Sequence, residues 1–139
     1  ESVFQQWTGL MEGESDTIVR MANTAALLKV CFGWWWVGFY RVMNDELLLG
    51  PFQGPPACTR IKTGKGVCGT SWEQRKTIVV PDVDLFPGHI ACSAASRSEI
   101  VVPIIRNETV IAVLDADSEH LNHFDETDVF WLEKIAKSI

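Results

Sequence analysis

The sequence contains no long run of apolar residues and no excess of basic ones. No apolar stretch approaches the roughly 20 residues that a transmembrane helix needs, so we expect no membrane span. The chain has 12 Lys and Arg residues against 18 Asp and Glu residues, a formal net charge of −6. Because no basic stripe is present to displace the counterions of a phosphate backbone, we expect no binding to nucleic acid.

Cysteine is also scarce, with 4 in 139 residues. A scaffold held together by disulfides needs more cysteine and has a smaller core. Hydrophobic residues make up 47% of the chain, which is enough for the core of a single domain spanning residues 1–139. The first residues of the sequence do not form the apolar region of a secretory signal peptide. These features predict a cytoplasmic protein, whose cysteines serve as metal ligands, redox groups, nucleophiles or core residues.

Hydrophobic periodicity predicts an α+β domain with an antiparallel sheet. Helices are expected over residues 15–29, 69–75 and after Asp125, and strands over residues 36–42, 47–52, 78–80, 99–106 and 110–117. Asn44-Asp45 and Asn107-Glu108 are typical of hairpin turns. The stripe expected to be buried on the first helix consists of Ile18, Met21, Ala22, Ala25 and Leu28.

Two irregular stretches of about 15 residues interrupt this pattern. One follows Gly54-Pro55-Pro56 and the other runs from Asp82 to Ser98. Long loops in compact domains are uncommon and usually functional. Since the cysteines after residue 31 all lie in or beside these loops, the loops are the first candidates for a functional site.

The spacing of the cysteines does not match the paired C-x2-C pattern of a structural zinc site. A tetrahedral site made from three thiols and His89 by folding stays open as an alternative. Cys31 follows an apolar helical stripe, and we expect it to be an inert core residue.

A reactive thiol needs a nearby cation or a helix N-terminus to favour the thiolate. Cys92 has His89 three residues before it and Arg97 five residues after it. Cys68 follows Lys65 and lies just before a predicted helix. The residues alone therefore do not decide which of the two cysteines is the nucleophile.

Asp115 and Asp117 are two residues apart on an apolar strand, so their side chains point to the same face. Burying two like charges together raises the pKa of at least one of them, which keeps a carboxyl group protonated and able to act as a general acid. The alternative is that the strand ends there and that both carboxylates are solvated.

Glu99 begins the strand that is expected to pair with the strand carrying Asp115 and Asp117. If the hairpin turn consists of Asn107-Glu108 alone, Glu99 faces Ala116 and lies on the face opposite the two aspartates. Convergence of all three carboxylates therefore requires a turn of odd length or a β-bulge. Pro103 marks the point where we expect such a bulge.

The aromatic run before and within the first strand is a further candidate for a binding wall. Strand alternation places Trp34, Trp36 and Tyr40 on one face, with Gly38 leaving room between them. Aromatic faces bind partly positive centres and sulfur groups. Core packing is expected for Phe39, whereas Trp36 and Tyr40 fit a core or a pocket equally well.

Several short motifs occur in a specific order along the chain. They are Trp36-Val-Gly-Phe-Tyr40, Ala57-Cys58, Gly64-Lys-Gly-Val-Cys68-Gly69, Pro87-Gly-His-Ile-Ala-Cys92, Ser96-Arg-Ser-Glu99 and Val113-Leu-Asp-Ala-Asp-Ser118. Together they resemble the free methionine-(R)-sulfoxide reductases, a family of GAF-domain enzymes.

The resemblance implies a GAF fold, a six-stranded antiparallel sheet with helices packed on one side and a loop-covered ligand pocket on the other. It also implies reduction of the R epimer of free methionine sulfoxide to methionine, without a metal or organic cofactor. Thioredoxin or a similar dithiol then restores the enzyme. Members of this family are often dimeric, so a homodimer is one expectation.

The resemblance also implies roles for individual residues. Cys92 matches the cysteine that attacks sulfur, Cys58 its usual resolving partner, and Cys68 a third thiol that takes part in some members. Asp82 is a further pocket candidate. The residues that match the substrate pocket are Trp36, Tyr40, Glu99, Asp115 and Asp117. The alternative function is that of a GAF domain that senses a small molecule without turning it over.

Overall fold

The computed structural model describes residues 2–89 and 95–139. The elements, in chain order, are α1 Ser2–Met11, α2 Thr17–Phe32, β1 Trp36–Met43, β2 Glu46–Gln53, β3 Arg60–Lys62, α3 Gly66–Gln74, β4 Ile78–Val80, the 3-10 helix η1 Val83–Leu85, β5 Ser98–Arg106, β6 Thr109–Ser118 and α4 Glu126–Lys137. Among the described residues, no helix combines the length and apolar character needed to cross a membrane.

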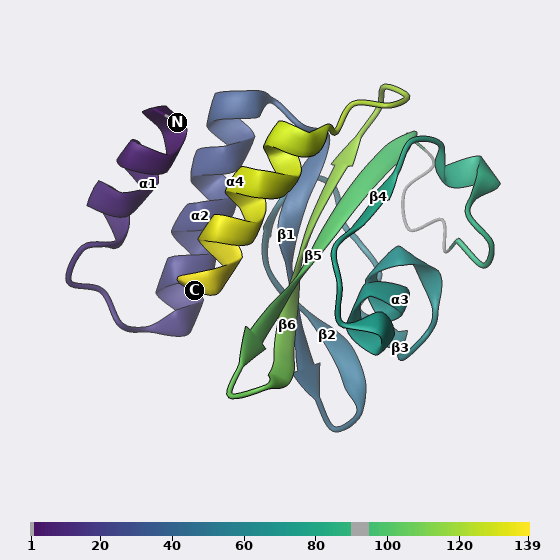
Figure 1. Ribbon diagram of the computed structural model, residues 1–139, viewed down its shortest axis with the longest axis horizontal. Helices are drawn as coiled ribbons and strands as arrows, with labels where there is room; N and C mark the ends of the chain where they lie inside the picture. Colours follow the sequence, from purple (N-terminus) through teal and green to yellow (C-terminus); the bar gives the residue numbers. More distant parts are fainter. Residues whose placement is uncertain (1, 90–94) are drawn as a thin grey trace.

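The strands form one sheet in the order β3-β2-β1-β6-β5-β4, and every neighbouring pair is antiparallel. Helices α1, α2 and α4 form a layer over one face, while α3 lies on the opposite side together with the short strand β3 (Figure 1). The predicted α+β architecture with a six-stranded antiparallel sheet is confirmed. This asymmetry leaves the α3 side of the sheet available for a pocket.

The main core lies between the sheet and the helical layer. Alternate strand residues point into it, because successive side chains in a strand project to opposite faces. Its sheet residues include Val37, Phe39, Ile100, Val102, Leu114 and Ala116, and its helical residues include Trp7, Met21, Leu28, Leu132 and Ile135. Each large apolar side chain buried in this way stabilises the fold by about 1.5–3 kcal/mol. The remaining strand residues are free to build the other face.

The ends of two helices follow from local signals. The side chain of Asp16 accepts a hydrogen bond from the backbone N–H of Val19 at the start of α2. Asp125 and Asp128 form a reciprocal capping box at the start of α4, so the predicted cap at Asp125 is confirmed. Such caps contribute about 1 kcal/mol each.

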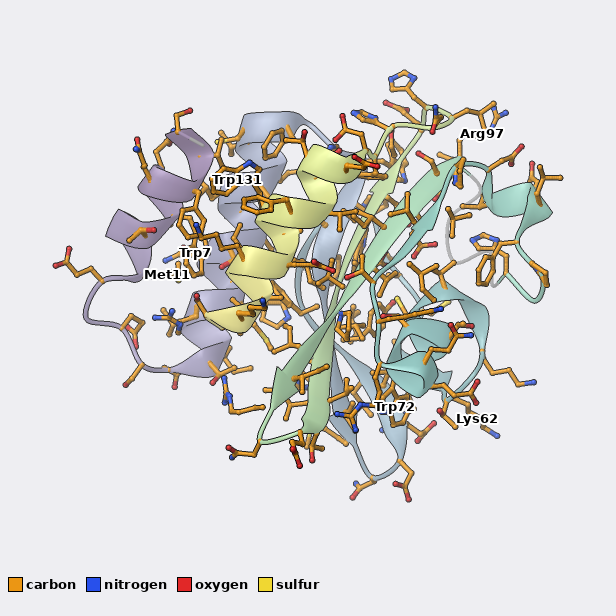
Figure 2. All side chains as sticks on the ribbon, viewed as in Figure 1. Trp7, Met11, Lys62, Trp72, Arg97 and Trp131 are labelled. Atoms are coloured by element: carbon orange, nitrogen blue, oxygen red, sulfur yellow. The ribbon has the colours of Figure 1, made fainter. Side chains whose placement is uncertain are left out.

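The structure contains three elements that the sequence pattern did not predict: α1, β3 and the 3-10 helix η1, which lies in a stretch expected to be irregular. Helix α1 is held to α2 by a buried hydrogen bond of 2.7 Å from the Trp7 indole N–H to the Thr24 hydroxyl, and Figure 2 shows Trp7 and Met11 in the helical layer. Its buried residues are only these two, too few for a clear periodic signal. Strand β3 has three residues within a loop and owes its existence to pairing with β2.

Three expectations about burial were wrong. Ile18 is 46% exposed and Ala22 is also exposed, because α2 buries the face that carries Thr24 instead. Cys31 is exposed rather than part of the core. Trp34 is buried in the helical core and packs against Phe124. It precedes the first residue of β1 and so lies outside the strand alternation.

Candidate active site

A β-bulge places Glu99 on the same face of the sheet as the two aspartates. The hairpin turn is the two-residue Asn107-Glu108, in which both residues have positive φ. Two residue pairs from the turn the register shifts by one residue, because Ile111 of β6 has no partner on β5. Glu99 therefore pairs with Asp117. The required bulge is confirmed, but its expected position was wrong, since Pro103 lies in regular pairing with β6.

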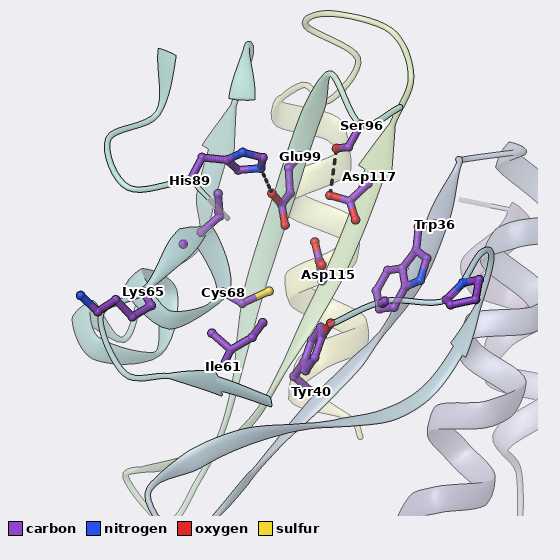
Figure 3. Close-up of a pocket in the computed structure, with 14 residues that line it drawn as sticks. Trp36, Tyr40, Ile61, Lys65, Cys68, His89, Ser96, Glu99, Asp115 and Asp117 are labelled. Carbon is purple, nitrogen blue, oxygen red and sulfur yellow. Dashed lines mark hydrogen bonds and ion pairs between the residues drawn. The ribbon is translucent and has the colours of Figure 1, made fainter. Parts of the chain in front are cut away.

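A pocket lies between this face of the sheet, helix α3 and the loops before and after it (Figure 3). It holds about 540 Å³ of space free of protein atoms, a volume that includes its opening to solvent. Its lining residues are Trp36, Tyr40, Pro56, Ala57, Ile61, Lys65, Gly66, Val67, Cys68, His89, Ser96, Glu99, Asp115 and Asp117. All the described residues that matched the substrate pocket, and Cys68, thus lie in one place.

Trp36 and Tyr40 of β1 form an aromatic wall. Their ring centroids are 6.0 Å apart and the rings lie 23° from parallel. Gly38 between them permits this arrangement, because a Cβ there lies only 2.3 Å from the Phe52 Cβ and 2.8 Å from the Trp36 ring. Gly38 was predicted to leave room between the two aromatic rings. The structure shows that the close approach of Phe52 on β2 also requires a residue without a side chain at this position.

Hydrogen bonds hold this wall to the loop that carries Cys58. The Trp36 indole N–H donates to the Pro55 carbonyl at 3.1 Å. The Tyr40 hydroxyl donates to the Cys58 carbonyl at 2.8 Å. Burial and the charge of Asp115 raise the pKa of Tyr40, so its hydroxyl keeps this proton at neutral pH. The loop is thereby fixed over the pocket.

The carboxyl groups converge opposite the aromatic wall. Glu99 and Asp115 are 6% and 5% exposed, and Asp117 is partly exposed. The Ser96 hydroxyl donates to Asp117 at 3.4 Å, and His89 Nε2 lies 3.8 Å from Glu99 Oε1. Asp115 Oδ1 has no hydrogen-bond partner. The alternative of solvated carboxylates at a strand end is therefore wrong for Asp115.

Burial raises the pKa of all three carboxyl groups. The pKa of Asp115 rises to about 6. The pKa values of Glu99 and Asp117 rise well above the ordinary range, and the charge of Asp115 adds to the effect of burial. Burial lowers the pKa of His89, against the opposing charge of Asp84. These shifts favour the uncharged forms of His89 and Glu99, and a carboxyl group that is kept protonated in this way is able to donate a proton.

Cys68 is a buried free thiol in the first turn of α3, near the carboxyl groups. The helix lies close against β3, since a Cβ on Gly69 lies only 2.6 Å from the Lys62 carbonyl oxygen. Burial, followed by the charges of Asp115 and Glu99, raises the pKa of Cys68 well above its ordinary value. Cys68 is therefore a protonated thiol at neutral pH and a poor nucleophile.

The remaining candidate residues in the two loops are Cys58, Cys92 and Asp82. Cys58 is disulfide-bonded, so in this state it does not supply a thiolate to the zinc site of three thiols and a histidine. Cys92 lies outside the described residues. Asp82 caps η1 by accepting from the Asp84 N–H and does not line the pocket among the described residues, so its assignment as a pocket candidate was wrong.

Several lining residues were not assigned to the pocket from the sequence. Ser96 lay within a motif but carried no separate signal, and His89 was considered only as a neighbour of Cys92 and as a ligand of the zinc site with three thiols. Ile61 belongs to the unpredicted strand β3, and Pro56 lies in an irregular loop. Their place in the pocket depends on loop packing, which no local periodicity reveals.

Asp115→Asn will raise the free energy of unfolding at neutral pH, and it will raise it much less at pH 4. The pKa of Asp115 rises from 3.8 to about 6 on folding, so stability present below about pH 4 is lost as the pH rises through 6. The asparagine variant avoids this loss, which is about 3 kcal/mol at pH 7. Urea unfolding at pH 4 and pH 7 measures the difference. Asp45→Asn, in the exposed β1–β2 turn, is the control and will show no such pH dependence.

Comparison with known proteins places this geometry in a family. The GAF domain model matches residues 14–139. The chain is 42% identical to the free methionine-R-sulfoxide reductase of Escherichia coli (97% of this chain, 82% of the relative) and 40% identical to that of Saccharomyces cerevisiae (100% and 82%). A solved free methionine-R-sulfoxide reductase from Neisseria meningitidis, in complex with its substrate, is 57% identical, with a TM-score of 0.95 over 97% of this chain and 82% of that one. The chain therefore belongs to the free methionine-(R)-sulfoxide reductase family of GAF-domain proteins.

Proposed function

We propose that the protein reduces the R epimer of free methionine sulfoxide to methionine. The observation that carries this proposal is the convergence of three carboxyl groups and two aromatic rings on one small pocket, beside a loop that holds the disulfide-bonded Cys58. Relatives that share the fold and 40–57% of the sequence carry the name of this reductase.

The pocket supports recognition of a free amino acid. Among the described residues that line it, the carboxyl groups are those of Glu99, Asp115 and Asp117, and whichever of them is ionised attracts the ammonium group of the substrate. Trp36 and Tyr40 provide a face for the partly positive methyl-sulfur end. A substrate whose amino group is acylated loses the first of these interactions, which explains a preference for the free amino acid.

The proposed chemistry starts with attack of the Cys92 thiolate on the partly positive sulfur of the sulfoxide. A protonated carboxyl group among Glu99, Asp115 and Asp117 supplies a proton to the sulfoxide oxygen. The protonated oxygen is transferred from the substrate sulfur to the Cys92 sulfur as the bond between the two sulfurs breaks, which yields methionine and a Cys92 sulfenic acid. The Cys58 thiol then displaces water from that sulfenic acid and forms a disulfide. Exchange with thioredoxin or a similar dithiol returns both cysteines to thiols.

Two features support this division of labour among the cysteines. Cys58 takes part in a disulfide, as a resolving cysteine does in the oxidised enzyme. Cys68 is a free thiol with a raised pKa, which disfavours it as the attacking group. The thioredoxin partner, the homodimer and the cytoplasmic location stay predictions from the family resemblance.

The proposed function is tested by following methionine formation by chromatography, with dithiothreitol as the reductant. Free methionine-(R)-sulfoxide and its N-acetyl derivative are compared at equal concentration. We expect conversion of the free amino acid and at least a tenfold lower kcat/KM for the acetylated form, because the carboxylates lose their cationic partner. Binding of the free sulfoxide without any conversion indicates a sensor domain instead.

Cys58→Ser will allow a single turnover but will slow recycling. The attacking cysteine still forms its sulfenic acid, whereas the disulfide that thioredoxin reduces cannot form. Rapid quenching will show about one methionine per chain, followed by a steady-state rate with thioredoxin at least tenfold below that of the wild type. Cys31→Ser removes an exposed thiol and will leave both phases unchanged. An unaltered steady-state rate in Cys58→Ser assigns resolution to Cys68.

A further inference from the structure

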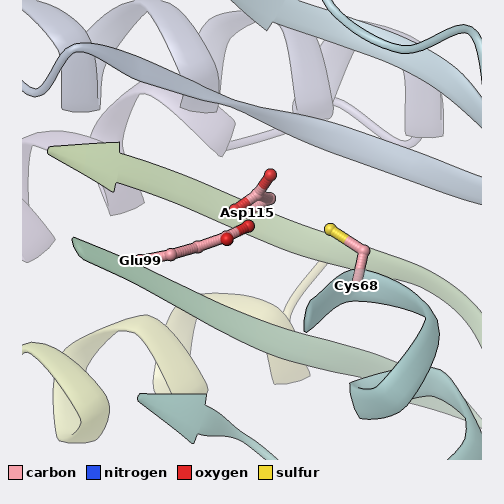
Figure 4. Close-up of side chains that lie close together, drawn as sticks. All are labelled: Cys68, Glu99 and Asp115. Carbon is pink, nitrogen blue, oxygen red and sulfur yellow. The ribbon is translucent and has the colours of Figure 1, made fainter. Parts of the chain in front are cut away.

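We propose that the pocket also forms a binding site for a thiophilic divalent cation, with Zn²⁺ as the prototype, held by Cys68, Glu99 and Asp115. One ligand atom from each residue lies within 4.8 Å of the other two. The side chains converge from α3, β5 and β6 (Figure 4). All three are at least nine-tenths buried, unlike the scattered acidic groups of a protein surface.

An unpartnered oxygen points to a cationic ligand at this place. Asp115 Oδ1 is buried, lines the pocket and has no hydrogen-bond partner. Among the described residues, no lysine or arginine forms an ion pair with Glu99 or Asp115. A buried carboxylate oxygen without a partner is unfavourable, and a bound cation satisfies it directly.

The donor set selects the kind of metal. A thiolate together with two carboxylates suits Zn²⁺, whereas Mg²⁺ and Ca²⁺ prefer six or more oxygen ligands. Ligand atoms around tetrahedral zinc lie about 3.3–3.7 Å apart, so small side-chain shifts close the present spacing. His89 Nε2, 3.8 Å from Glu99 Oε1, is placed to complete the tetrahedron. Binding displaces to solvent the thiol proton of Cys68 and the carboxyl proton that Glu99 carries.

This site differs from the zinc site of three thiols and a histidine considered from the sequence. It uses one thiol, and that thiol is free while Cys58 is disulfide-bonded. The metal therefore needs no reduced catalytic cysteine. Because Glu99 and Asp115 also line the proposed substrate pocket, the metal and the sulfoxide exclude one another. That competition rests on the proposed function, whereas binding of the metal does not.

The test uses the oxidised protein, with the disulfide of Cys58 intact, in a Cys31→Ser background. Cys68 is then the remaining free thiol among the described residues. Titration with Co²⁺ is followed by absorption, and Zn²⁺ binding is measured by calorimetry. We expect one metal per chain and a thiolate-to-cobalt charge-transfer band. Mg²⁺ will not compete.

Adding Cys68→Ser will remove the charge-transfer band and weaken Zn²⁺ binding at least tenfold. Asp115→Asn, which changes no thiol, will weaken Zn²⁺ binding as well. Glu108→Gln, in the exposed hairpin turn, is the matched control and will change neither reading. Absence of the band in the Cys31→Ser protein, or unchanged Zn²⁺ affinity after Cys68→Ser, refutes the site. Either result is independent of whether the protein reduces methionine sulfoxide.

Discussion

Cys92→Ser will abolish reduction of free methionine-(R)-sulfoxide, with kcat falling by about a thousandfold or more. A serine hydroxyl is not ionised at neutral pH and does not form a sulfenic acid, so the first chemical step is lost. Methionine formation with dithiothreitol measures this directly. Cys31→Ser makes the same substitution at an exposed cysteine of α2 that does not line the pocket and will retain full activity.

The Cys92→Ser result also separates binding from chemistry. The variant keeps the carboxyl groups and the aromatic wall, so the affinity for methionine sulfoxide measured by calorimetry will change little. Retained turnover in this variant assigns the attack to Cys68, in spite of its raised pKa. Loss of turnover with unchanged affinity is the combination that the mechanism requires.

Glu99→Gln will lower kcat by about a hundredfold to ten-thousandfold. Its carboxyl group is buried, and burial together with the charges of Asp115 and Asp117 raises its pKa well above the ordinary value. This shift favours the protonated form of Glu99, which is the form that donates a proton to the leaving oxygen. The amide of glutamine keeps the shape of the side chain without the acidic proton. Glu108→Gln, at the exposed turn of the same hairpin, will have normal activity.

The pH profile identifies which carboxyl group is the acid. The proton is present below the pKa of the donor in the folded protein, so kcat of the wild type will fall as the pH rises through that value. Glu99→Gln will lose this alkaline decline along with most of its activity. If Glu99→Gln keeps both activity and decline while Asp117→Asn loses both, the donor is Asp117.

Local sequence signals predict much of this fold. The turns at Asn44-Asp45 and Asn107-Glu108 carry positive φ at both residues, which is the geometry that such dipeptides favour in two-residue hairpins. Asp125 caps α4 through its own side chain. These features involve neighbouring residues, so the sequence alone is sufficient to predict them.

Features set by distant contacts were harder to predict. Strand alternation requires a bulge if Glu99 is to lie on the same face as the aspartates. The position of the bulge at Ile111, however, depends on packing along the whole hairpin. Pro103 was the only local signal, and it was misleading. Trp34 and Cys31 were misplaced for a similar reason, since the first residue of β1 and the buried face of α2 are set by tertiary packing.

The candidate site was predicted in its residue types and only partly in its organisation. Strand alternation correctly placed Asp115 and Asp117 on one face, and Trp36 and Tyr40 lie together across the pocket. The hydrogen bond from Ser96 to Asp117 and the contact of His89 with Glu99 come from a loop without periodicity. The pKa shifts require knowledge of burial, which a sequence pattern does not supply.

The most direct test of the proposed function is oxidation of NADPH coupled through thioredoxin reductase and thioredoxin, with the R and S epimers of free methionine sulfoxide supplied separately. The account predicts NADPH consumption with the R epimer and none above background with the S epimer. A parallel reaction with dithiothreitol, read as methionine formed, separates a mismatched thioredoxin from an inactive enzyme. Equal rates with both epimers, or no methionine from the R epimer with either reductant, would contradict the proposed function.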